Sequence, residues 1–396
     1  KLHLEDKFLD YVREDLPDEY DEALENITVY DLLTMQAGSP ECCNNVWFSR
    51  LEKDWEKNWL GQPKLKEDIG KVFHYDSGCS YTLSRIVTKV MGENCLSIMQ
   101  KRVFDKLGFG KINWLTSPEG HNTGGWGMYL TADQISTLAQ LLLQKGNQLV
   151  PQWWIEEMGQ SRVVIPGDEK KALTHYAYHI KAGKEIFAAE GAFGQYLVCF
   201  RELPVAIGIT AGAREYLAAD ICLKYMKEAV SIPCPEEKRE EGEKYLEAKI
   251  KSLSLPQPEG RLKTAEKELS GLFNREIIFT ENPRNIESAK IIPEGCKLRL
   301  EMIVQGEKKI AYAGFKSWKQ NDLYPDDFTK RYHSIAYGMD QETLYLSVGL
   351  LNTSYREEYS FWVNSKDTVI ATWRPNVTYL PEQPDMVWKF TGNFKS

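Results

Sequence analysis

A tyrosine, an acid and a hydroxyl stand together at Tyr75, Asp76 and Ser77, immediately ahead of an apolar helical pattern. A phenol ionises near pH ~10, so it acts as a base only where its anion is stabilised. The N-terminus of a helix favours such an anion through its dipole. Tyr75 is therefore a candidate proton-transfer residue. The alternative is a helix N-cap with aromatic packing beside it.

Two further stretches combine glycines with aromatic residues. The segment 121–131, HNTGGWGMYLT, places Gly125 and Trp126 in a loop ahead of a helix. The segment 189–198, AEGAFGQYLV, ends a strand and enters a hairpin; it contains Glu190, Gly191, Ala192 and Phe193. Because glycines mark turns more often than ligand contacts, a purely structural role is the alternative for both stretches.

Metal and cofactor chemistry is not expected. The six histidines form no ligand pattern, and motifs for zinc, phosphate or dinucleotide binding are absent from the sequence. His175 and His179 lie in an alternating stretch, THYAYHIK, where strand residues four apart are separated by ~13 Å. That spacing argues against a shared zinc ion, so we expect neither a metal nor a cofactor.

Composition limits the partners and the compartment. The formal net charge is −8 and no basic patch is evident, which argues against nucleic acid. No run approaches the ~18 apolar residues of a membrane span. The opening KLHLEDKFLDYV lacks the regions of a signal peptide, and the eight cysteines lack metal spacing. We therefore expect reduced thiols and a cytoplasmic location.

Periodicity divides the chain into three parts. Residues 1–231 open with helices, including capping boxes at Thr28–Asp31 and Thr131–Gln134, and continue into an antiparallel meander from about 174. The helix opened by the first box is expected to stop at Gly38. Residues 232–264 are charged and bracketed by prolines, which predicts a linker with a solvated helix. Residues 265–396 predict an all-β sandwich or barrel.

The order of these segments resembles the serine β-lactamase-related family over residues 1 to about 230. The matching segments include ITVYDLLTMQAGSP, VFHYDSGCSYTLSRIV, HNTGGWGMYLT and AEGAFGQYLVCF. The family includes class C β-lactamases, penicillin-binding-protein-like esterases and amide hydrolases. The resemblance implies an α+β fold of the β-lactamase/transpeptidase type, an antiparallel sheet flanked by helices, with the β-domain appended.

Members of this family use three motifs: S-x-x-K for the nucleophile and its lysine, Y-x-N for proton transfer, and a K-T-G-like triplet on an edge strand. By position, Tyr75 matches the tyrosine of the second motif, with Ser77 where asparagine is commonest. The third motif falls on 189–192, where this chain has no lysine or histidine. The resemblance implies substrate contacts in both glycine-containing stretches, namely Gly125, Trp126, Glu190, Gly191, Ala192 and Phe193.

The first motif is absent from the sequence. No serine is followed three positions later by lysine, and the nearest match, Thr264–Lys267, lies beside the predicted linker. The opening stretch resembles the segment that follows S-x-x-K in the family. We therefore expect an N-terminally shortened chain that is inactive as it stands; a lineage that has lost the motif is the alternative. Self-association or a partner segment is expected to cover the strands left exposed.

Two functions follow from these observations. The first is a serine hydrolase that, in full-length form, acts on an ester or amide through an acyl-serine, with Tyr75 transferring protons. Glu190 would disfavour anionic substrates, which favours small uncharged ones over β-lactams. The second is a non-catalytic ligand-binding or interaction module on the same scaffold, with Tyr75, Trp126 and Phe193 lining a cleft.

Overall fold

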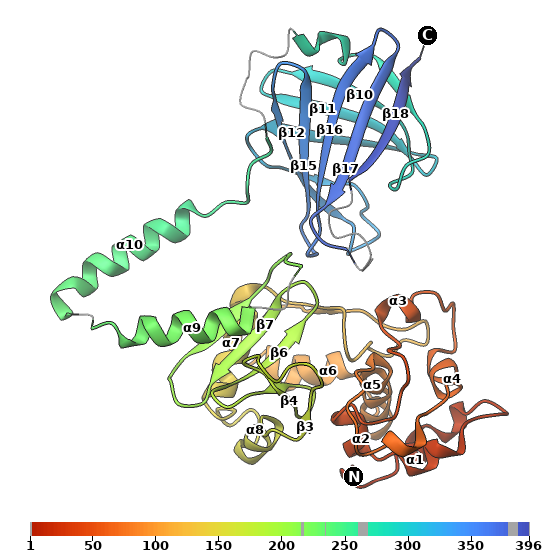
Figure 1. The fold of residues 1–396 in the computed structure, drawn as a ribbon, viewed down its shortest axis with the longest axis vertical. Coiled ribbons are helices and arrows are strands. Elements are labelled where there is room, and N and C mark those ends of the chain that lie inside the picture. The colour runs from red at the N-terminus through yellow and green to blue at the C-terminus, as the bar shows by residue number, and fades with distance from the viewer. Residues whose placement is uncertain (1, 215–217, 234, 260–267, 379–386, 396) are drawn as a thin grey trace. The chain divides into compact units, whose positions relative to one another are not determined.

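A computed structural model describes residues 2–214, 218–233, 235–259, 268–378 and 387–395 (Figure 1). The chain forms two compact units, one of residues 1–210 and 216–231 and the other of residues 211–215 and 232–396. Among the described residues, no helix is long and apolar enough to cross a membrane.

The first unit combines short helices with an antiparallel sheet. Its helices are α1 (Leu9–Val12), α2 (Val29–Leu33), α3 (Asn45–Phe48), α4 (Trp55–Leu60), α5 (Ser77–Met91), α6 (Cys95–Met99), α7 (Ala132–Leu143), α8 (Gln152–Met158) and α9 (Ala218–Ser231). Its strands are β1 (Asn113–Trp114), β2 (Met128–Tyr129), β3 (Val163–Val164), β4 (His175–Tyr176), β5 (Lys181–Ala182), β6 (Ile186–Gly191), β7 (Gln195–Phe200) and β8 (Ala206–Ile209).

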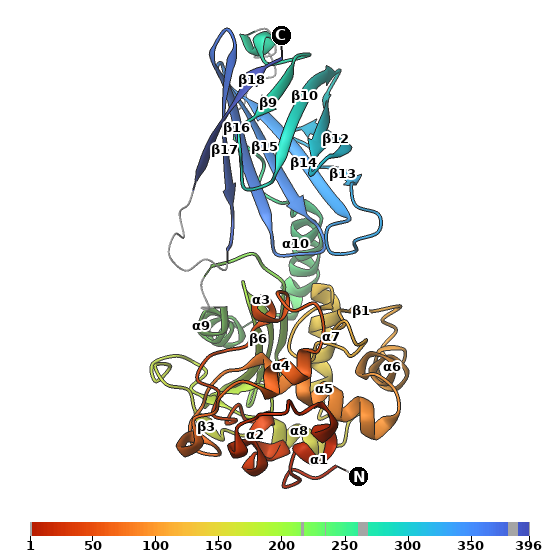
Figure 2. The same cartoon turned by 90° about the vertical axis from the view of Figure 1, so that its right-hand side faces the viewer.

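Helix α5 is the element that carries the tyrosine motif. It begins at Ser77 and ends against Gly92, whose φ of 74° is the left-handed conformation that glycine adopts without a Cβ penalty. Its buried face packs on α1, α2, α3 and α4 in one apolar cluster that includes Phe8, Leu32, Trp59 and Tyr81. Figure 2 shows α5 among these N-terminal helices.

The two predicted capping boxes are present, but the first helix is shorter than expected. Thr28 and Asp31 cap α2 reciprocally, and Thr131 and Gln134 cap α7 in the same way. Helix α2 ends at Leu33 rather than near Gly38, because Met35 adopts a φ of 58°, which is incompatible with a continuing right-handed helix.

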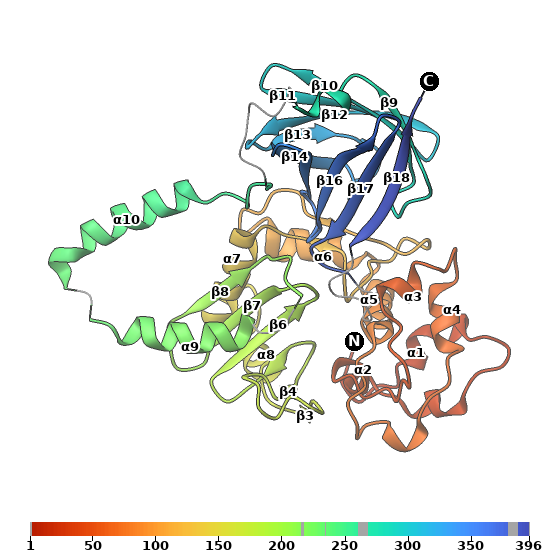
Figure 3. The same ribbon diagram turned by 45° about the horizontal axis from the view of Figure 1, so that its top comes forward.

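The main sheet of this unit runs β3-β4-β5-β6-β7-β8, with every neighbouring pair antiparallel. Alternate residues of β6 and β7 point to opposite faces. Ile186, Ala188 and Val198 pack with α9, whereas Phe187 and Cys199 pack with α7. Figure 3 shows these two helices on opposite faces of the sheet. The expected antiparallel sheet flanked by helices is confirmed.

The second unit is a closed β-barrel preceded by α10 (Arg239–Ser252). The strands are β9 (Glu276–Phe279), β10 (Ile286–Glu294), β11 (Lys297–Val304), β12 (Glu307–Phe315), β13 (Lys319–Asp322), β14 (Tyr332–Met339), β15 (Thr343–Leu350), β16 (Arg356–Ser365), β17 (Thr368–Pro375) and β18 (Trp388–Phe394). They pair in the order β12-β11-β10-β9-β18-β17-β16-β15-β14-β13. A parallel pairing of β12 with β14 closes the ring, so of the two predicted β-architectures the barrel is correct.

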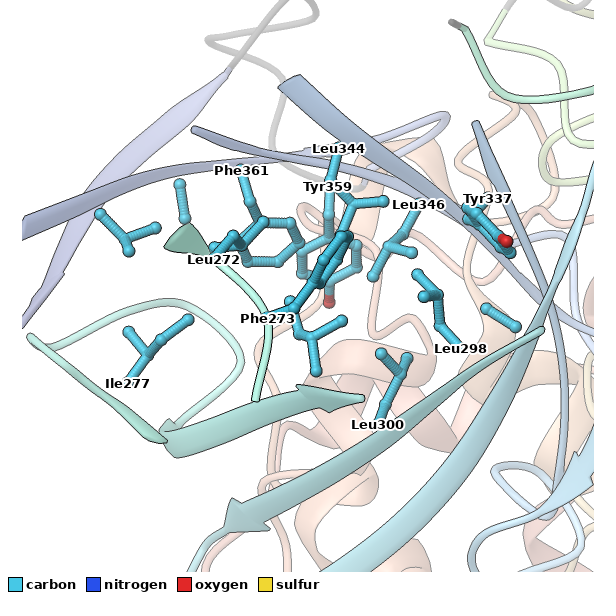
Figure 4. Close-up of a cluster of buried hydrophobic side chains, with 14 of the residues drawn as sticks. Leu272, Phe273, Ile277, Leu298, Leu300, Tyr337, Leu344, Leu346, Tyr359 and Phe361 are labelled. Atoms are coloured by element: carbon cyan, nitrogen blue, oxygen red, sulfur yellow. The ribbon is translucent and has the colours of Figure 1, made fainter. Parts of the chain in front are cut away.

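One end of the barrel is filled by the segment before β9. Leu269, Leu272 and Phe273 are buried among inward-facing strand residues such as Leu298 and Phe361. Figure 4 shows Leu272 and Phe273 pointing into this cluster. Apolar burial of this kind contributes roughly 1.5–3 kcal/mol for each large side chain. The segment therefore acts as a plug that is part of the barrel core.

Helix α10 has no buried residue and carries many charged side chains. Ion pairs four residues apart join Lys244 to Glu240 and Arg239 to Glu243. Each such exposed pair stabilises a helix by only ~0.3–0.5 kcal/mol. The helix is thus supported by its own sequence, without an apolar face packed on other described residues.

Candidate active site

Asp76 organises the start of α5. It is fully buried, and its carboxylate accepts hydrogen bonds from four donors. The backbone N–H groups of Gly78 and Cys43 donate at 2.9 and 3.1 Å, and Ser39 Oγ and Trp59 Nε1 donate at 2.5 and 2.8 Å. The N-cap interpretation is therefore correct for Asp76, which ties the helix start to two earlier segments.

Lys64 supplies the positive charge nearest to this buried carboxylate network. Its side chain is only 7% exposed, and its Nζ donates to Ser39 Oγ at 3.3 Å. The ammonium also lies 4.3 Å from the centre of the Trp59 ring, a favourable cation–π distance. Sequence reasoning missed this lysine, because it stands alone in the loop after α4 with no motif around it.

Gly78 makes the packing at the helix start feasible. A Cβ at this position would lie 2.0 Å from Trp59 Nε1. Any larger residue would push the indole away from Asp76 and break its hydrogen bond. Glycine is therefore required by the close approach of Trp59, and its left-handed freedom is not used here.

Tyr75 and Ser77 face different environments although they flank the same aspartate. Tyr75 is 45% exposed, and its ring meets Tyr176 edge-on with centroids 6.4 Å apart. Ser77 is the first residue of α5 and is buried. Burial raises the pKa of Tyr176 well above its ordinary value, so the ring beside Tyr75 is a neutral phenol at pH 7.

The glycine-rich loop lies directly against α5. A Cβ on Gly124, which has a φ of 73°, would lie 2.1 Å from the carbonyl oxygen of Ser80. A Cβ on Gly125 would lie 3.0 Å from Ser80 Oγ and 3.7 Å from Ser77 Cβ. The structure thus brings the second predicted stretch onto the helix that carries Tyr75, and glycine permits the close approach.

Trp126 has the contacts of a packing residue. Its ring lies 5.2 Å from that of Phe48 and stacks at 6.0 Å on Trp55, within the N-terminal apolar cluster. Its backbone carbonyl accepts a hydrogen bond from Trp114 Nε1 at 2.9 Å. The ring is partly buried.

Glu190 is paired with a lysine that the sequence motif did not indicate. Its Oε2 lies 2.5 Å from Lys181 Nζ, and Tyr196 donates to its Oε1 at 2.7 Å. Lys181 comes from β5, the strand next to β6, and lies also 3.9 Å from Asp168. Residues 189–192 contain no basic side chain, and the lysine that pairs with Glu190 comes from the adjacent strand.

The turn after Glu190 joins β6 to β7. Phe193 has a φ of 63° and Gly194 a φ of 89°, so two successive residues are left-handed. Gly194 N–H donates to Gly191 O at 3.3 Å, and Gln195 Nε2 donates to Ala192 O at 3.3 Å. Phe193 is unusual there, because a non-glycine residue in this conformation is strained.

A set of contacts leads from α5 to the strand that carries Glu190. Tyr75 touches Tyr176 of β4, and Tyr176 stands opposite Lys181 in the β4–β5 pair. Lys181 in turn pairs with Glu190 of β6. A ring contact, a strand pairing and an ion pair therefore lead from the first predicted stretch to the third.

His179 packs beside this region, with its ring centroid 6.5 Å from that of Tyr176. His179 adopts a φ of 54° in the turn between β4 and β5, and burial lowers its pKa to about 4, so it is a neutral, packed residue. Across the described residues, no group of three His, Cys, Asp or Glu side chains could hold a metal ion. Thr264–Lys267 lies outside the described residues.

A model of the β-lactamase family matches residues 1–220. The octameric penicillin-binding protein homologue from Pyrococcus abyssi is 13% identical, covers 93% of this chain and 81% of its own, and has a TM-score of 0.43. A penicillin-binding protein from Bacillus halodurans is 17% identical over 56% of this chain and 80% of its own, with a TM-score of 0.40.

D-amino acid amidase from Ochrobactrum anthropi SV3, in complex with D-phenylalanine, is 12% identical over 59% of this chain and 85% of its own, with a TM-score of 0.43. No curated protein matches the sequence. The family model spans more than half of the 396 residues and contains Tyr75, the glycine-rich loop and Glu190. The chain therefore belongs to the β-lactamase family.

Proposed function

We propose that residues 1–231 form the body of a serine hydrolase site that acts on a small ester or amide, with Tyr75 as the proton-transfer residue. The proposal rests on the different environments of two adjacent residues at the start of α5. Asp76 is buried and held by four donors, while the adjacent Tyr75 is 45% exposed. A tyrosine that only packed in the core would be buried. It would not be exposed beside a carboxylate that is held by four hydrogen bonds.

The hairpin between β6 and β7 is the proposed oxyanion site. A tetrahedral intermediate is stabilised by backbone N–H groups fixed in advance toward the developing negative charge. The left-handed Phe193 and Gly194 turn the backbone sharply beside Ala192. Gly191 and Ala192 would then contact the substrate carbonyl, and Phe193 would contact its apolar part.

An uncharged substrate fits the charge balance near the hairpin. Lys181 and Glu190 neutralise each other at 2.5 Å, so neither side chain is a free counter-ion for a substrate carboxylate. β-Lactams and peptidoglycan peptides carry such a carboxylate, which makes neutral esters and amides the better substrates. Gly125, from the loop that packs on α5, would border the same site.

The nucleophile is the missing component. No serine in the sequence is followed three positions later by lysine, so the 396-residue chain is proposed to be inactive in acyl transfer. Tyr75 and the hairpin would act only together with an S-x-x-K segment. The chemistry would be attack of the serine on the carbonyl, with Tyr75 accepting its proton and returning it to the leaving group.

A fluorophosphonate probe tests this proposal directly. The 396-residue chain should show no serine labelling, whereas the same chain extended at its N-terminus by the S-x-x-K segment of a penicillin-binding protein homologue should be labelled. In the extended protein, Tyr75→Phe should slow labelling by ~10²-fold or more, as expected for loss of a general base. Tyr225→Phe, an exposed tyrosine on α9, is the matched control and should leave the rate unchanged. Labelling of the unextended chain, or an unaffected Tyr75→Phe rate, would refute the proposal.

A non-catalytic binding module is the second candidate, favoured by the absence of S-x-x-K from the sequence. In that case a neutral amide should bind the 396-residue chain saturably, and the extended chain should bind it without becoming labelled. Tyr75→Phe would then lower the affinity for the amide by the loss of one contact, and there would be no labelling rate to change.

We also propose that the chain self-associates through the sheet of the first unit. Among the described strands, β8 pairs only with β7, which leaves its other edge unpaired. An unpaired strand edge is a template for pairing with another chain. Light scattering coupled to size exclusion should report a dimer or larger assembly. A monomer at all concentrations would contradict this proposal.

A further inference from the structure

The barrel of the second unit encloses a cavity that the proposed hydrolase chemistry does not use. It is lined mainly by apolar residues from β10, β11, β14, β15 and β16, among them Ile291, Met302, Ile335, Leu346 and Phe361. The plug of Leu269, Leu272 and Phe273 fills the other part of the interior. The cavity therefore lies in the half of the barrel where β10, β14 and β16 begin.

Polar residues are concentrated at one end of this cavity. Glu357, at the start of β16, is 5% exposed and lies 3.1 Å from Arg284 Nε, and Tyr359 donates to its other oxygen at 2.7 Å. Arg284 comes from the turn before β10, and 42% of its side chain is exposed. Part of the Arg284 side chain thus stays accessible after the ion pair with Glu357 has formed.

His333 lies at the same end and is not satisfied. It is 6% exposed, lines the cavity, and its Nδ1 has no hydrogen-bond partner among the described residues. Its ring lies 5.8 Å from that of Tyr324, another lining residue. Burial, followed by the nearby Arg284 charge, lowers the pKa of His333 to about 4, so the imidazole is neutral at pH 7. An unpaired polar atom at such depth costs roughly 1–3 kcal/mol unless something hydrogen-bonds to it.

The size of the cavity limits the ligand. The cavity has a volume of about 110 Å³. Since about 10–15 Å³ holds one water, the cavity has room for roughly seven to eleven groups of that size. A single unbranched chain of about eight carbons with one polar group has a comparable number of heavy atoms, whereas a sterol or a double-chain lipid does not.

The charge balance limits the head group. Arg284 is already neutralised by Glu357, so a ligand carboxylate would place a second negative charge beside a buried one. A cation would face the Arg284 guanidinium. A neutral group with hydrogen-bonding capacity, such as a hydroxyl or a primary amide, meets His333 and the exposed part of Arg284 without either repulsion.

We propose that the barrel binds an uncharged medium-chain amphiphile, with its hydrocarbon chain among Ile335, Leu346 and Phe361 and its hydroxyl or amide group at His333 and Arg284. This site is independent of Tyr75 and of the hydrolase chemistry proposed above. It makes the second unit a small-molecule binding domain in its own right.

Calorimetric titration of the full chain at pH 7 with octan-1-ol, octanamide and octanoate tests the proposal. Octan-1-ol and octanamide should bind saturably at one site, and octanoate at least tenfold more weakly. Glu357→Gln removes the competing carboxylate and should reverse this order, while Glu342→Gln, an exposed glutamate of the same barrel, should not. Tyr75→Phe should leave octan-1-ol binding unchanged, which separates this inference from the proposed hydrolase.

A hydrogen-exchange measurement on the wild-type chain tests the proposal even if the Glu357→Gln variant does not fold. Octan-1-ol should slow amide hydrogen exchange in peptides from β14 and β16 and not in those from β6 and β7. Absence of saturable binding by octan-1-ol and octanamide, octanoate binding as tightly as octan-1-ol, or protection outside the barrel would each overturn the inference.

Discussion

Two networks of charged side chains, one in each unit, differ in how completely their hydrogen bonds are satisfied. In the first unit the Asp76 carboxylate accepts four hydrogen bonds and lies near a buried ammonium, in a region packed with aromatic rings. In the barrel, Glu357 and Arg284 pair beside a cavity, and within the described part of the chain Nδ1 of His333 has no hydrogen-bond partner. A fully satisfied network rigidifies its surroundings, whereas a partly satisfied one next to space invites a ligand. The first network fixes the backbone next to Tyr75, and the second borders the proposed binding cavity.

The largest effect is expected from breaking the satisfied network. Asp76→Ala leaves four donors without an acceptor and removes the carboxylate nearest Lys64, which should destabilise the first unit by about 3–5 kcal/mol. Peptide-resolved hydrogen exchange in urea would measure this, because it reports each unit separately. Glu14→Gln, which breaks the exposed pair with Lys89, is the control and should change stability by less than about 0.5 kcal/mol. An equal loss in barrel peptides would show that the network is not confined to its unit.

Truncations inside the barrel should distinguish its packed half from its cavity. Leu298→Ala removes a fully buried side chain from the packed part and should cost about 3 kcal/mol, since the surrounding core cannot collapse completely. Leu346→Ala removes a leucine that already borders open space, so it should cost less and should enlarge the cavity. Denaturant midpoints of the barrel transition give both values. Equal costs would indicate that the cavity collapses in solution.

Glu56 is a buried carboxyl group that should make the stability of the first unit depend on pH. It is 2% exposed, accepts from Thr82 Oγ1 at 2.8 Å, and has no partner for Oε2 among the described residues. Burial raises its pKa from 4.5 to about 7. The protonated form is thus favoured in the folded state, and the stability it contributes is fully present below pH 4.5 and lost as the pH rises to 7.

The wild-type first unit should therefore lose about 2 kcal/mol between pH 5 and pH 8 from this group alone. Glu56→Gln resembles the protonated carboxyl and should remove that loss, making the variant the more stable protein at pH 8. Urea unfolding at both pH values provides the measurement. A variant that is less stable than wild type at pH 8 would show that the ionised carboxylate is required.

Local features of the fold were readable in the sequence. The capping boxes at Thr28 and Thr131 were predicted correctly, because each depends on residues three positions apart. The N-cap role open to the Tyr75 stretch was also readable, since Asp76 precedes an apolar helical stripe. The β-domain was predicted as all-β from alternation along single strands.

Features that depend on distant residues were not readable. The predicted meander implies that consecutive strands pair, but no pattern in the sequence gives the register that brings Lys181 to Glu190. Lys64 meets the Asp76 network through Ser39, which lies 25 positions earlier in the chain. The choice between sandwich and barrel depended on the pairing of β12 with β14, at Gly314–Ala336 and Phe315–Tyr337. The roles of Tyr75 and the hairpin as site residues remain predictions.

The closing of the barrel carries a consequence for its synthesis. Strand β9 pairs with β18, the last strand of the chain, through contacts such as that between Phe279 and Gly392. This pairing joins the two ends of the domain. The chain therefore loses conformational entropy in closing a long loop before the core contacts that compensate for it are complete. The helices of the first unit mostly join nearby segments and can settle while translation continues. The barrel cannot close until β18 has been made, so a chain whose synthesis stops before β18 carries an open sheet with unpaired strand edges.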